Sequence, residues 1–567
     1  MKKVLLLSIL LVSSFYLFGQ TELTLSTESA VNTQIKLDQA SDNPADVYIA
    51  ESGKIYFWDA TLSVDFDLHI KGTSSDWIGN QDNPPVFVPV PNDAGDVFAM
   101  VNATSGSIKF ENILMNGINA TEGANPVGQF IEETGASEVI VDNCGFSDFR
   151  SYVMVINSAP DLVSIKNCIM INGLRYSNSP WGGGIGRFNN PGDSVIIENN
   201  TVVNSGRLLG DGGNFYQTTF IENHNSFLNS LTNAQSIHWK QGLMANNIFY
   251  NWSVMGATPS DVAYNYSFTN WAYYDGLAVD SVSLYNGRNL LYRDPKVYEH
   301  YEKETLDTLE VRPYIVWNQH VDTTVQNVDN FTIGKSYWDI DPEFTSEPNN
   351  FDKMMEWVSF RHTGEGSWPD WRVQSAVTYD DQGQPVVSWP PNFDLSYSNQ
   401  DIKVGATDGL PIGDLNWFPN EKENYLENRD SYIAALEDSI TNAKSVFNPE
   451  DSLSYRITAD DIVAIDSKNG LIGPKKVELV GNYPNPFNPS TNIEYKLANR
   501  SEVTVTIYNI LGEKVKTLFS KKSIGQGTHK IKWNGIDNNG KKVSAGIYFA
   551  KLKTRNAVKT EKMLLLK

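Results

Sequence analysis

The sequence contains few cysteines and few basic residues for its length. Cys144 and Cys168 are the two cysteines among 567 residues, which excludes a framework of several disulfides and a cysteine-rich zinc cluster. Asp and Glu outnumber Lys and Arg by 67 to 45, so the net charge is −22. This negative charge argues against a nucleic-acid-binding protein that depends on phosphate contacts. At roughly 100–200 residues per domain, the length predicts two to four domains or one long repeat.

Long apolar runs are also missing, apart from one at the N-terminus. Lys2 and Lys3 precede an apolar run from Val4 to Phe18, and Gly19 and Gln20 follow it. This pattern is typical of a cleaved secretory signal peptide, because roughly 15 apolar residues are too few to span a bilayer comfortably. A short membrane anchor is the alternative. We predict a signal peptide over 1–20 and a mature chain without a transmembrane segment, in a compartment where thiols can oxidise.

The charge is unevenly distributed along the chain. Residues 477–567 hold 16 Lys and Arg against 6 Asp and Glu, a net charge of +10. Residues 21–476 hold 27 against 61, a net charge of −34. We therefore expect an acidic body followed by a separate basic tail domain.

A short motif recurs in the acidic body: Asn, two residues, an apolar residue, one residue, Asn. Its strict and looser copies start at Asn112, Asn143, Asn167, Asn199, His224, Asn246 and Asn265. The spacing predicts a unit of about two dozen residues, in which short strand-like runs precede each copy and Gly, Asn, Asp and Pro separate them. Such units bury an apolar face only when they stack, so the pattern predicts a parallel β-helix.

Stacking explains the residues inside the motif. The third position after the first Asn is apolar in every copy, and the first position holds Asn200, Asn225 and Asn247 in succession. We expect the apolar column to face the core and the three asparagines to form an amide ladder. The Asn at the fifth position suits a left-handed bend. Cys144 and Cys168 should be neighbours on adjacent coils, and buried thiols are favoured over a disulfide there.

With this repeat, residues 97–270 resemble the right-handed parallel β-helix superfamily that includes pectate lyases and polygalacturonases. The segment 47–72 resembles the opening coils of such proteins. The resemblance implies a β-helix over 21–419, with substrate lying along the outside of one sheet. It does not fix an activity, because one fold supports many functions.

Seven of the 14 tryptophans lie between Trp317 and Trp417, in a region rich in Asp, Pro, Tyr and Asn. We expect this region to form long ordered loops over the final coils, in the C-terminal part of the β-helix, or a small satellite subdomain. Their tryptophans either pack against its open end or stack on sugars, with Trp368, Trp371 and Trp389 as candidates for stacking. Helical spacing of Tyr425, Ile433, Leu436 and Ile440 predicts a helix from 420 to about 447, within a helical segment and linker over 420–476.

The tail, 477–567, shows about seven short strands of period two with Gly and Asn-Gly turns, which predicts a small immunoglobulin-like β-sandwich. The pieces NYPNPFNPST (482–491), YNILGEKV (508–515) and WNGIDNNGKKVSAGIYF (533–549), with a terminal lysine, resemble the type A C-terminal sorting domain of the type IX secretion system. The resemblance implies a Gram-negative cell, Sec export, the type IX machinery as partner, and a product that is secreted or held at the outer cell surface. A carbohydrate-binding sandwich is the alternative.

Candidate site residues come from the β-helix surface, because the sequence has no nucleophile elbow, Walker loop, HExxH or dinucleotide fingerprint. Alignment of the second strand-like run of each unit predicts one outward column of Glu132, Arg187, Tyr216, His238 and Lys240. For a lyase acting on acidic glycans, Lys240, His238 and Arg187 are the catalytic candidates: Lys240 takes the proton α to the uronate carboxylate, and Arg187 or Arg175 pairs with that carboxylate. The loop 173–192, with Arg175 and Trp181, is the expected rim of a groove. The predicted substrate-binding residues are Arg175, Trp181, Tyr216, Glu132, Trp368 and Trp371.

Two function classes remain open from the sequence. The first is a secreted, monomeric β-helix that binds polysaccharide and cleaves it by β-elimination; the second is a non-catalytic adhesin or glycan-binding surface protein. The same charged residues could also merely keep an exposed sheet soluble. The paired carboxylates of a hydrolase are not apparent. Ca²⁺ is a candidate cofactor at Asp339 and Asp341 or near Asp211.

Overall fold

The computed structural model describes most of the chain, and the predicted signal peptide lies outside the described residues except for Gln20. The described residues are 20–74, 83–90, 99–118, 127–174, 182–211, 216–232, 239–255, 283–303, 330–363, 369–442, 456–457, 478–497, 501–510, 513–524, 527–554 and 558–566. They form two compact units: Met1–Gly334 with Pro342–Pro449, and Lys335–Asp341 with Glu450–Lys567. Within the described ranges, no helix is long and apolar enough to cross a membrane.

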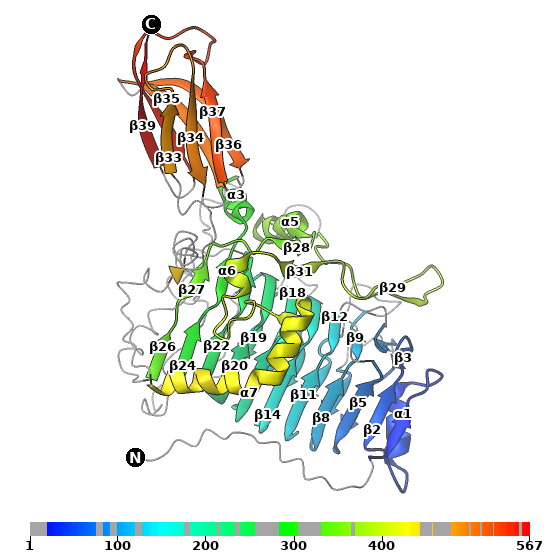
Figure 1. Ribbon diagram of the computed structural model, residues 1–567. Coiled ribbons are helices and arrows are strands. Elements are labelled where there is room, and N and C mark those ends of the chain that lie inside the picture. The colour runs from blue at the N-terminus through cyan, green and yellow to red at the C-terminus, as the bar shows by residue number, and fades with distance from the viewer. Residues whose placement is uncertain are drawn as a thin grey trace. The chain divides into compact units, whose positions relative to one another are not determined.

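The first unit is a stack of coils, each of which gives strands to parallel sheets (Figure 1). Sheet A consists of β1 (Glu22–Thr24), β2 (Val47–Ala50), β5 (Leu68–Gly72), β8 (Ser107–Glu111), β11 (Glu138–Asp142), β14 (Leu162–Lys166), β17 (Ser194–Glu198), β20 (Gln217–Asn223), β22 (Trp239–Ala245), β24 (Ser283–Gly287) and β26 (Asn330–Ile333). Sheet B runs through β3 (Ile55–Trp58), β6 (Val86–Pro89), β9 (Leu114–Asn116), β12 (Gly145–Phe149), β15 (Ile169–Gly173), β18 (Thr201–Ser205), β21 (Ser226–Ser230), β23 (Ile248–Tyr250) and β25 (Leu290–Tyr292). Sheet C consists of β4 (Leu62–Val64), β7 (Val101–Ala103), β10 (Ile131–Glu133), β13 (Tyr152–Ile156), β16 (Gly184–Phe188) and β19 (Leu209–Asp211). The prediction of a parallel β-helix is confirmed.

The core follows the two inward columns that the repeat predicts. Phe146, Met170, Val202 and Phe227 pair in register along sheet B and are buried. Beside them, the amide ladder forms as expected between described coils. The Nδ2 of Asn200 donates to the Oδ1 of Asn225 at 3.0 Å.

The ladder continues beyond the three predicted members. The Nδ2 of Asn225 donates to the Oδ1 of Asn247 at 2.9 Å, and Asn247 donates to Asn289 at 3.0 Å. Cys144 and Cys168 occupy the preceding positions of the same column as buried, free thiols. The backbone N–H of Cys144 donates to the Sγ of Cys168 at 3.4 Å. Buried thiols on adjacent coils therefore agree with the expectation.

Left-handed residues mark both ends of five strands of sheet B: β12, β15, β18, β21 and β23. The fifth-position residues Asn172 and Asn204 have φ angles of 57° and 63°, as predicted. The first residue of the motif is also left-handed, with φ of 56° at both Asn167 and Asn199. Asn recurs at both ends of the motif because its short amide side chain tolerates this conformation and bonds locally. The Asn199 amide, for example, donates to the Oδ1 of Asn167 at 2.7 Å.

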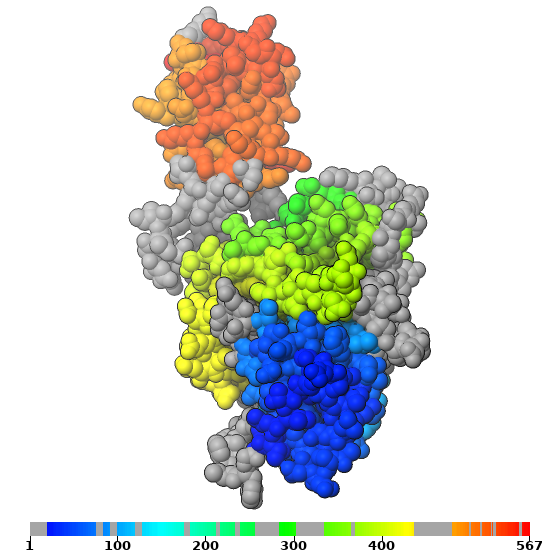
Figure 2. Space-filling model, turned by 90° about the vertical axis from the view of Figure 1, so that its right-hand side faces the viewer, coloured from blue at the N-terminus to red at the C-terminus, as the bar shows by residue number. Residues whose placement is uncertain are grey.

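Residues 369–418, here called the strap, lie along the outer side of sheet B. The strap includes β29 (Val377–Tyr379), β30 (Pro385–Val387), β31 (Asp394–Tyr397), α6 (Gln400–Lys403) and η2 (Leu415–Trp417). Its backbone N–H groups at Val373, Thr407 and Leu415 donate to side chains of the two left-handed turn columns. Figure 2 shows the strap and the following helix on two sides of the coils.

The remaining helices pack around the stack. α1 (Val31–Gln39) lies at its N-terminal end, and α3 (Pro295–Lys303) and α5 (Phe351–Thr363) come from the loops of the later coils. α7 (Pro419–Asn442) crosses the outer face of sheet A, where Ile433 packs against Ile221, Leu243 and Tyr285 (Figure 1). The helix predicted over 420 to about 447 thus forms through Asn442, and its last residues lie outside the described part.

The second unit contains two antiparallel sheets and one parallel pair. β27 (Ser336–Trp338) pairs with β32 (Arg456–Ile457). One sheet has the order β33 (Glu478–Tyr483), β34 (Thr491–Leu497), β37 (Gly527–Trp533), and the other has the order β36 (Lys514–Ile524), β35 (Ser501–Asn509), β38 (Gly546–Lys553), β39 (Val558–Leu565). Ile493 and Trp533 of the first sheet pack against Ile507, Tyr548 and Met563 of the second. This is the predicted β-sandwich.

Candidate functional site

Two of the predicted site residues share one outward column on sheet C. In register, the column runs Ser63, Asn102, Glu132, Val155, Arg187, Gly210. Glu132 in β10 and Arg187 in β16 are separated by the single strand β13, so their backbones lie roughly 10 Å apart at the usual strand spacing. Arg187 is exposed and Glu132 is half-buried. The structure therefore brings these two residues to one face.

Lys240 and Tyr216 do not join this column. Lys240 lies in β22 of sheet A, and Tyr216 directly precedes β20 of the same sheet. The alignment of their runs with sheet C is wrong, because sheet C ends at β19 in the described residues and both runs lead into sheet A. The proposed roles of these side chains remain predictions. His238, Arg175, Trp181 and Trp368 lie outside the described residues.

Two tryptophans of the strap, Trp371 and Trp389, are buried. Trp371 is 3% exposed and packs in a cluster with Trp357, Leu174 and Leu231. Trp389 is 7% exposed and lies against Gly145, where an added Cβ would come within 3.1 Å of its ring. Protein covers both rings, so packing, rather than sugar stacking, describes their role here. Trp371 was predicted to contact substrate; its burial favours the packing alternative, and contact with substrate remains a prediction.

A chain of hydrogen bonds connects Glu132 to Arg187 across the surface of sheet C. The Nε of Arg187 donates to the Oδ1 of Asn189 at 3.1 Å, and the Nδ2 of Asn189 donates to the Oδ1 of Asn157 at 2.6 Å. The Nδ2 of Asn157 then donates to the Oε1 of Glu132 at 3.4 Å. Gln129 donates to the other carboxylate oxygen at 3.4 Å. We call Glu132, Asn157, Arg187 and Asn189 the polar row.

Asn157 and Asn189 were missed in the sequence. Each directly follows a strand of sheet C, in YVMVIN and GIGRFN, so the signal was an Asn at the end of equivalent runs. The recurring motif lies at the ends of the sheet B strands and does not include this turn. Both side chains are half-buried, beside the exposed Arg187.

The charged groups on sheet A near α7 serve a different purpose. Glu198 is buried, and the guanidinium of Arg429 from α7 donates to both of its oxygens, with Nη2 to Oε2 at 2.6 Å. The Tyr425 hydroxyl donates to the same carboxylate at 2.9 Å. Burial opposes ionisation of Glu198, but the Arg429 hydrogen bonds and charge outweigh it and lower its pKa. This cluster fastens α7 and offers no open binding face.

No group of three or more His, Cys, Asp and Glu side chains among the described residues is placed to hold a metal ion. Asp339 and Asp341 are within this part of the chain, whereas the side chain of Asp211 is not described. The calcium hypothesis gains no support from the described residues.

Comparison with known proteins identifies the tail. Residues 482–566 match the family described as the secretion system C-terminal sorting domain. The chain is thus a β-helix protein with a type IX secretion sorting domain, which directs it to the outer cell surface or the extracellular space.

The structural comparison finds PorZ, an essential bacterial surface component of the type IX secretion system of human oral-microbiomic Porphyromonas gingivalis. The two chains share 18% identity with a TM-score of 0.13, over 18% of this chain and 12% of the PorZ chain. No curated protein matches the sequence.

Proposed function

We propose that this protein is a surface glycan-binding protein whose β-helix binds polysaccharide along the outer face of sheet C. The polar row is the observation that carries the proposal. It presents amide, carboxylate and guanidinium groups on successive coils, one coil advancing about 4.8 Å. Sugar hydroxyl groups both donate and accept hydrogen bonds, so a row that alternates donors and acceptors suits them.

The faces of the other sheets support the choice of sheet C. The strap lies on the outer side of sheet B, and α7 packs against the later strands of sheet A. Arg187 is exposed and the other members of the row are half-buried, so solvent reaches each of them. Half-buried polar groups that already hold one another in place bind a ligand at a smaller entropy cost.

The charges favour a neutral glycan over a polyanionic one. The polar row contains one carboxylate and one guanidinium, which balance, and the body around it is strongly acidic. A polyanion would meet long-range repulsion from that charge. Cleavage of acidic glycans by β-elimination is less well supported, because Arg187 and Lys240 belong to different sheets.

Glycan binding is testable with the purified mature protein on a glycan array, followed by calorimetry with the retained glycans. The double variant Arg187→Ala, Asn189→Ala should lose at least tenfold in affinity, because it removes two adjacent donors of the polar row. Lys71→Ala, at an exposed position of sheet A, is the matched control and should bind as the wild type does. Equal binding by wild type and double variant would overturn this site.

The same preparation separates the two function classes. Incubation with pectate, alginate and glycosaminoglycans should leave the ultraviolet absorbance unchanged, because a binding protein forms no unsaturated product. An absorbance increase that Arg187→Ala abolishes would instead establish a lyase.

A further inference from the structure

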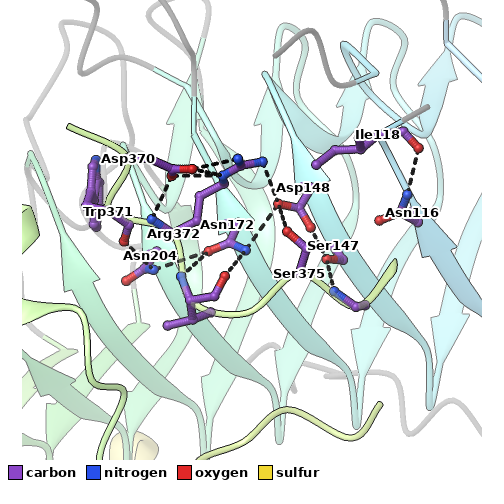
Figure 3. A network of polar contacts seen from close by, with 12 residues as sticks. Asn116, Ile118, Ser147, Asp148, Asn172, Asn204, Asp370, Trp371, Arg372 and Ser375 are labelled. Atoms are coloured by element: carbon purple, nitrogen blue, oxygen red, sulfur yellow. Dashed lines mark hydrogen bonds and ion pairs between the residues drawn. The ribbon is translucent and has the colours of Figure 1, made fainter. Parts of the chain in front are cut away.

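Buried titratable groups fasten the strap to the β-helix at several points. One is Asp148, which is fully buried at a left-handed turn with φ of 57° (Figure 3). Its Oδ1 accepts hydrogen bonds from the Oγ of Ser375 at 2.9 Å and from the Nδ2 of Asn172 at 3.2 Å. The Nη1 of Arg372 lies 3.6 Å away, and the Ser147 hydroxyl donates to Oδ2. Ser375 and Arg372 belong to the strap.

The positive charge of Arg372 is shared. Its Nη2 lies 2.7 Å from the Oδ2 of Asp370, whose side chain is 57% exposed (Figure 3). Arg372 therefore has a closer carboxylate than Asp148 and compensates the charge of Asp148 only in part. Ionisation of Asp148 leaves a poorly compensated negative charge in the interior.

Asp414 forms a second such contact, on the strap itself. It is 2% exposed, and its Oδ1 accepts from the Oγ1 of Thr201 in β18 at 2.8 Å. Its backbone N–H donates to the Oγ of Ser226 in β21 at 3.0 Å. Among the described residues its Oδ2 has no hydrogen-bond partner, and Lys422 is the cation that acts on it. A proton on this carboxyl removes the buried charge and leaves Oδ1 able to accept.

His224 is the third contact and is also fully buried. Its Nε2 lies 2.8 Å from the Oδ2 of Asp408, and its Nδ1 lies 3.1 Å from the carbonyl oxygen of Gly413, both in the strap. Both ring nitrogens thus face acceptors, an arrangement that only the doubly protonated imidazolium satisfies. The nearby carboxylate of Glu198 adds further negative charge.

Two of these residues stand at motif positions where the neighbouring coils carry asparagine. Asp148 occupies the fifth motif position, where the following coils carry Asn172, Asn204, Asn229 and Asn251. His224 occupies the first position, where the neighbouring coils carry Asn199 and Asn246. At each exception a titratable side chain replaces the uncharged amide, and that side chain bonds the strap.

All three groups favour closure of the strap when protonated. Burial raises the pKa of Asp148 from 3.8 to about 6 and that of Asp414 likewise to about 6. Burial lowers the pKa of His224, but the charge and hydrogen bond of Asp408 outweigh it and raise that pKa above 6.5. The carboxyl contributions are complete below about pH 4 and are lost as the pH rises through about 6, and the His224 contribution is lost at higher pH. Asp408 opposes this trend below about pH 4, because His224 lowers its pKa.

We propose that residues 369–418 are a pH-dependent strap, which holds the outer face of sheet B tightly in mild acid and opens more readily as the pH rises to neutrality and beyond. The carboxyls of Asp148 and Asp414 keep their protons while the strap is closed and release them when it opens. This property is independent of glycan binding on sheet C.

Hydrogen exchange of the purified full chain tests the strap. Peptides covering 369–376 and 406–418 should lose protection between pH 5 and pH 8 after correction for the chemical exchange rate. The opening equilibrium should increase about tenfold for each of Asp148 and Asp414. The pH rises by about one unit from 5 before it passes their pKa of about 6, and one unit corresponds to tenfold. Peptides from β11 and β14 should keep constant protection.

The variant Asp148→Asn, Asp414→Asn provides the decisive comparison. Asn restores the amide of the repeat at 148 and keeps both positions uncharged, so the variant should fold and show higher protection at pH 8. Its remaining pH dependence should be that of His224 alone, without the loss of protection between pH 5 and pH 6. Asp381→Asn, which removes an exposed carboxylate of the strap away from all three buried contacts, should retain the wild-type profile. A pH-independent wild-type strap, or a wild-type pH profile in the double variant, would overturn the proposal.

Discussion

The side-chain amide of Asn225 donates to Asn247 at 2.9 Å while its own oxygen accepts from Asn200 at 3.0 Å. Its Nδ2 also reaches the carbonyl oxygen of Ile197 at 3.0 Å. One buried side chain thereby satisfies polar groups on three neighbouring coils. The ladder is a stabilising network in which each member depends on the next.

Asn225→Leu should therefore destabilise the β-helix. The substitution leaves the amides of Asn200 and Asn247 each without one partner, at about 1–3 kcal/mol for each unsatisfied group. We expect the free energy of unfolding to fall by about 2–5 kcal/mol, measured by denaturant titration with fluorescence. Asn428→Ala, whose amide bonds only within α7, is the control and should change stability by less than about 0.5 kcal/mol. A loss that small in Asn225→Leu would contradict the ladder.

Arg429→Met should detach α7 from sheet A. Removal of the guanidinium leaves the buried Glu198 without its cation, a change that costs about 3–5 kcal/mol in buried pairs. Because the pKa of Glu198 is lowered, this contribution exists above its ordinary value of 4.5 and disappears as the pH falls through the folded value. Limited proteolysis within 419–442 at pH 7 should therefore accelerate in the variant. The second change Glu198→Gln should slow it again, and failure of this rescue would show that Arg429 acts through other contacts.

Trp371→Ala distinguishes packing from sugar stacking. The indole is buried in the cluster with Trp357, so its removal creates a cavity that costs about 3–5 kcal/mol. Glycan affinity of the folded variant should match that of the wild type, because the ring lies under protein. A selective loss of glycan affinity with unchanged stability would restore the stacking interpretation.

The two cysteines should resist thiol reagents in the native protein. Both are buried, and burial raises the pKa of the Cys168 thiol well above its ordinary value, so little thiolate is present. An Ellman-type titration should detect almost no thiol in the native state and two in denaturant without reductant. Absence of thiols after denaturation would reveal a disulfide instead.

The core was predictable because the same residue types recur at the same motif positions in successive coils. The asparagine ladder, the apolar column and the left-handed turns all follow from in-register stacking, which brings like positions of successive motifs together. The tail was predictable for another reason, since its sequence pieces resemble a known sorting domain over their whole length.

The strap was not predictable from periodicity. Val373 bonds Asn172 and Ser375 bonds Asp148 across 201 and 227 residues, and no local pattern reports a contact of that range. The error at Lys240 has a related cause. The strand-like runs 214–218 and 236–240 resemble the earlier runs that form sheet C. In the described residues, however, sheet C ends at β19, and these later runs lead into strands of sheet A. Only the strand pairing reveals this difference.

The end of sheet C at β19 also limits the length of the proposed glycan-binding face. As far as the chain is described, sheet C has six strands, and at about 4.8 Å per step its face extends roughly 24 Å from β4 to β19. An oligosaccharide bound lengthwise across this face would gain contacts with each added sugar only until it reached both ends. The β-helix would then act as a molecular ruler, for which affinity rises with chain length and levels off at a short oligomer.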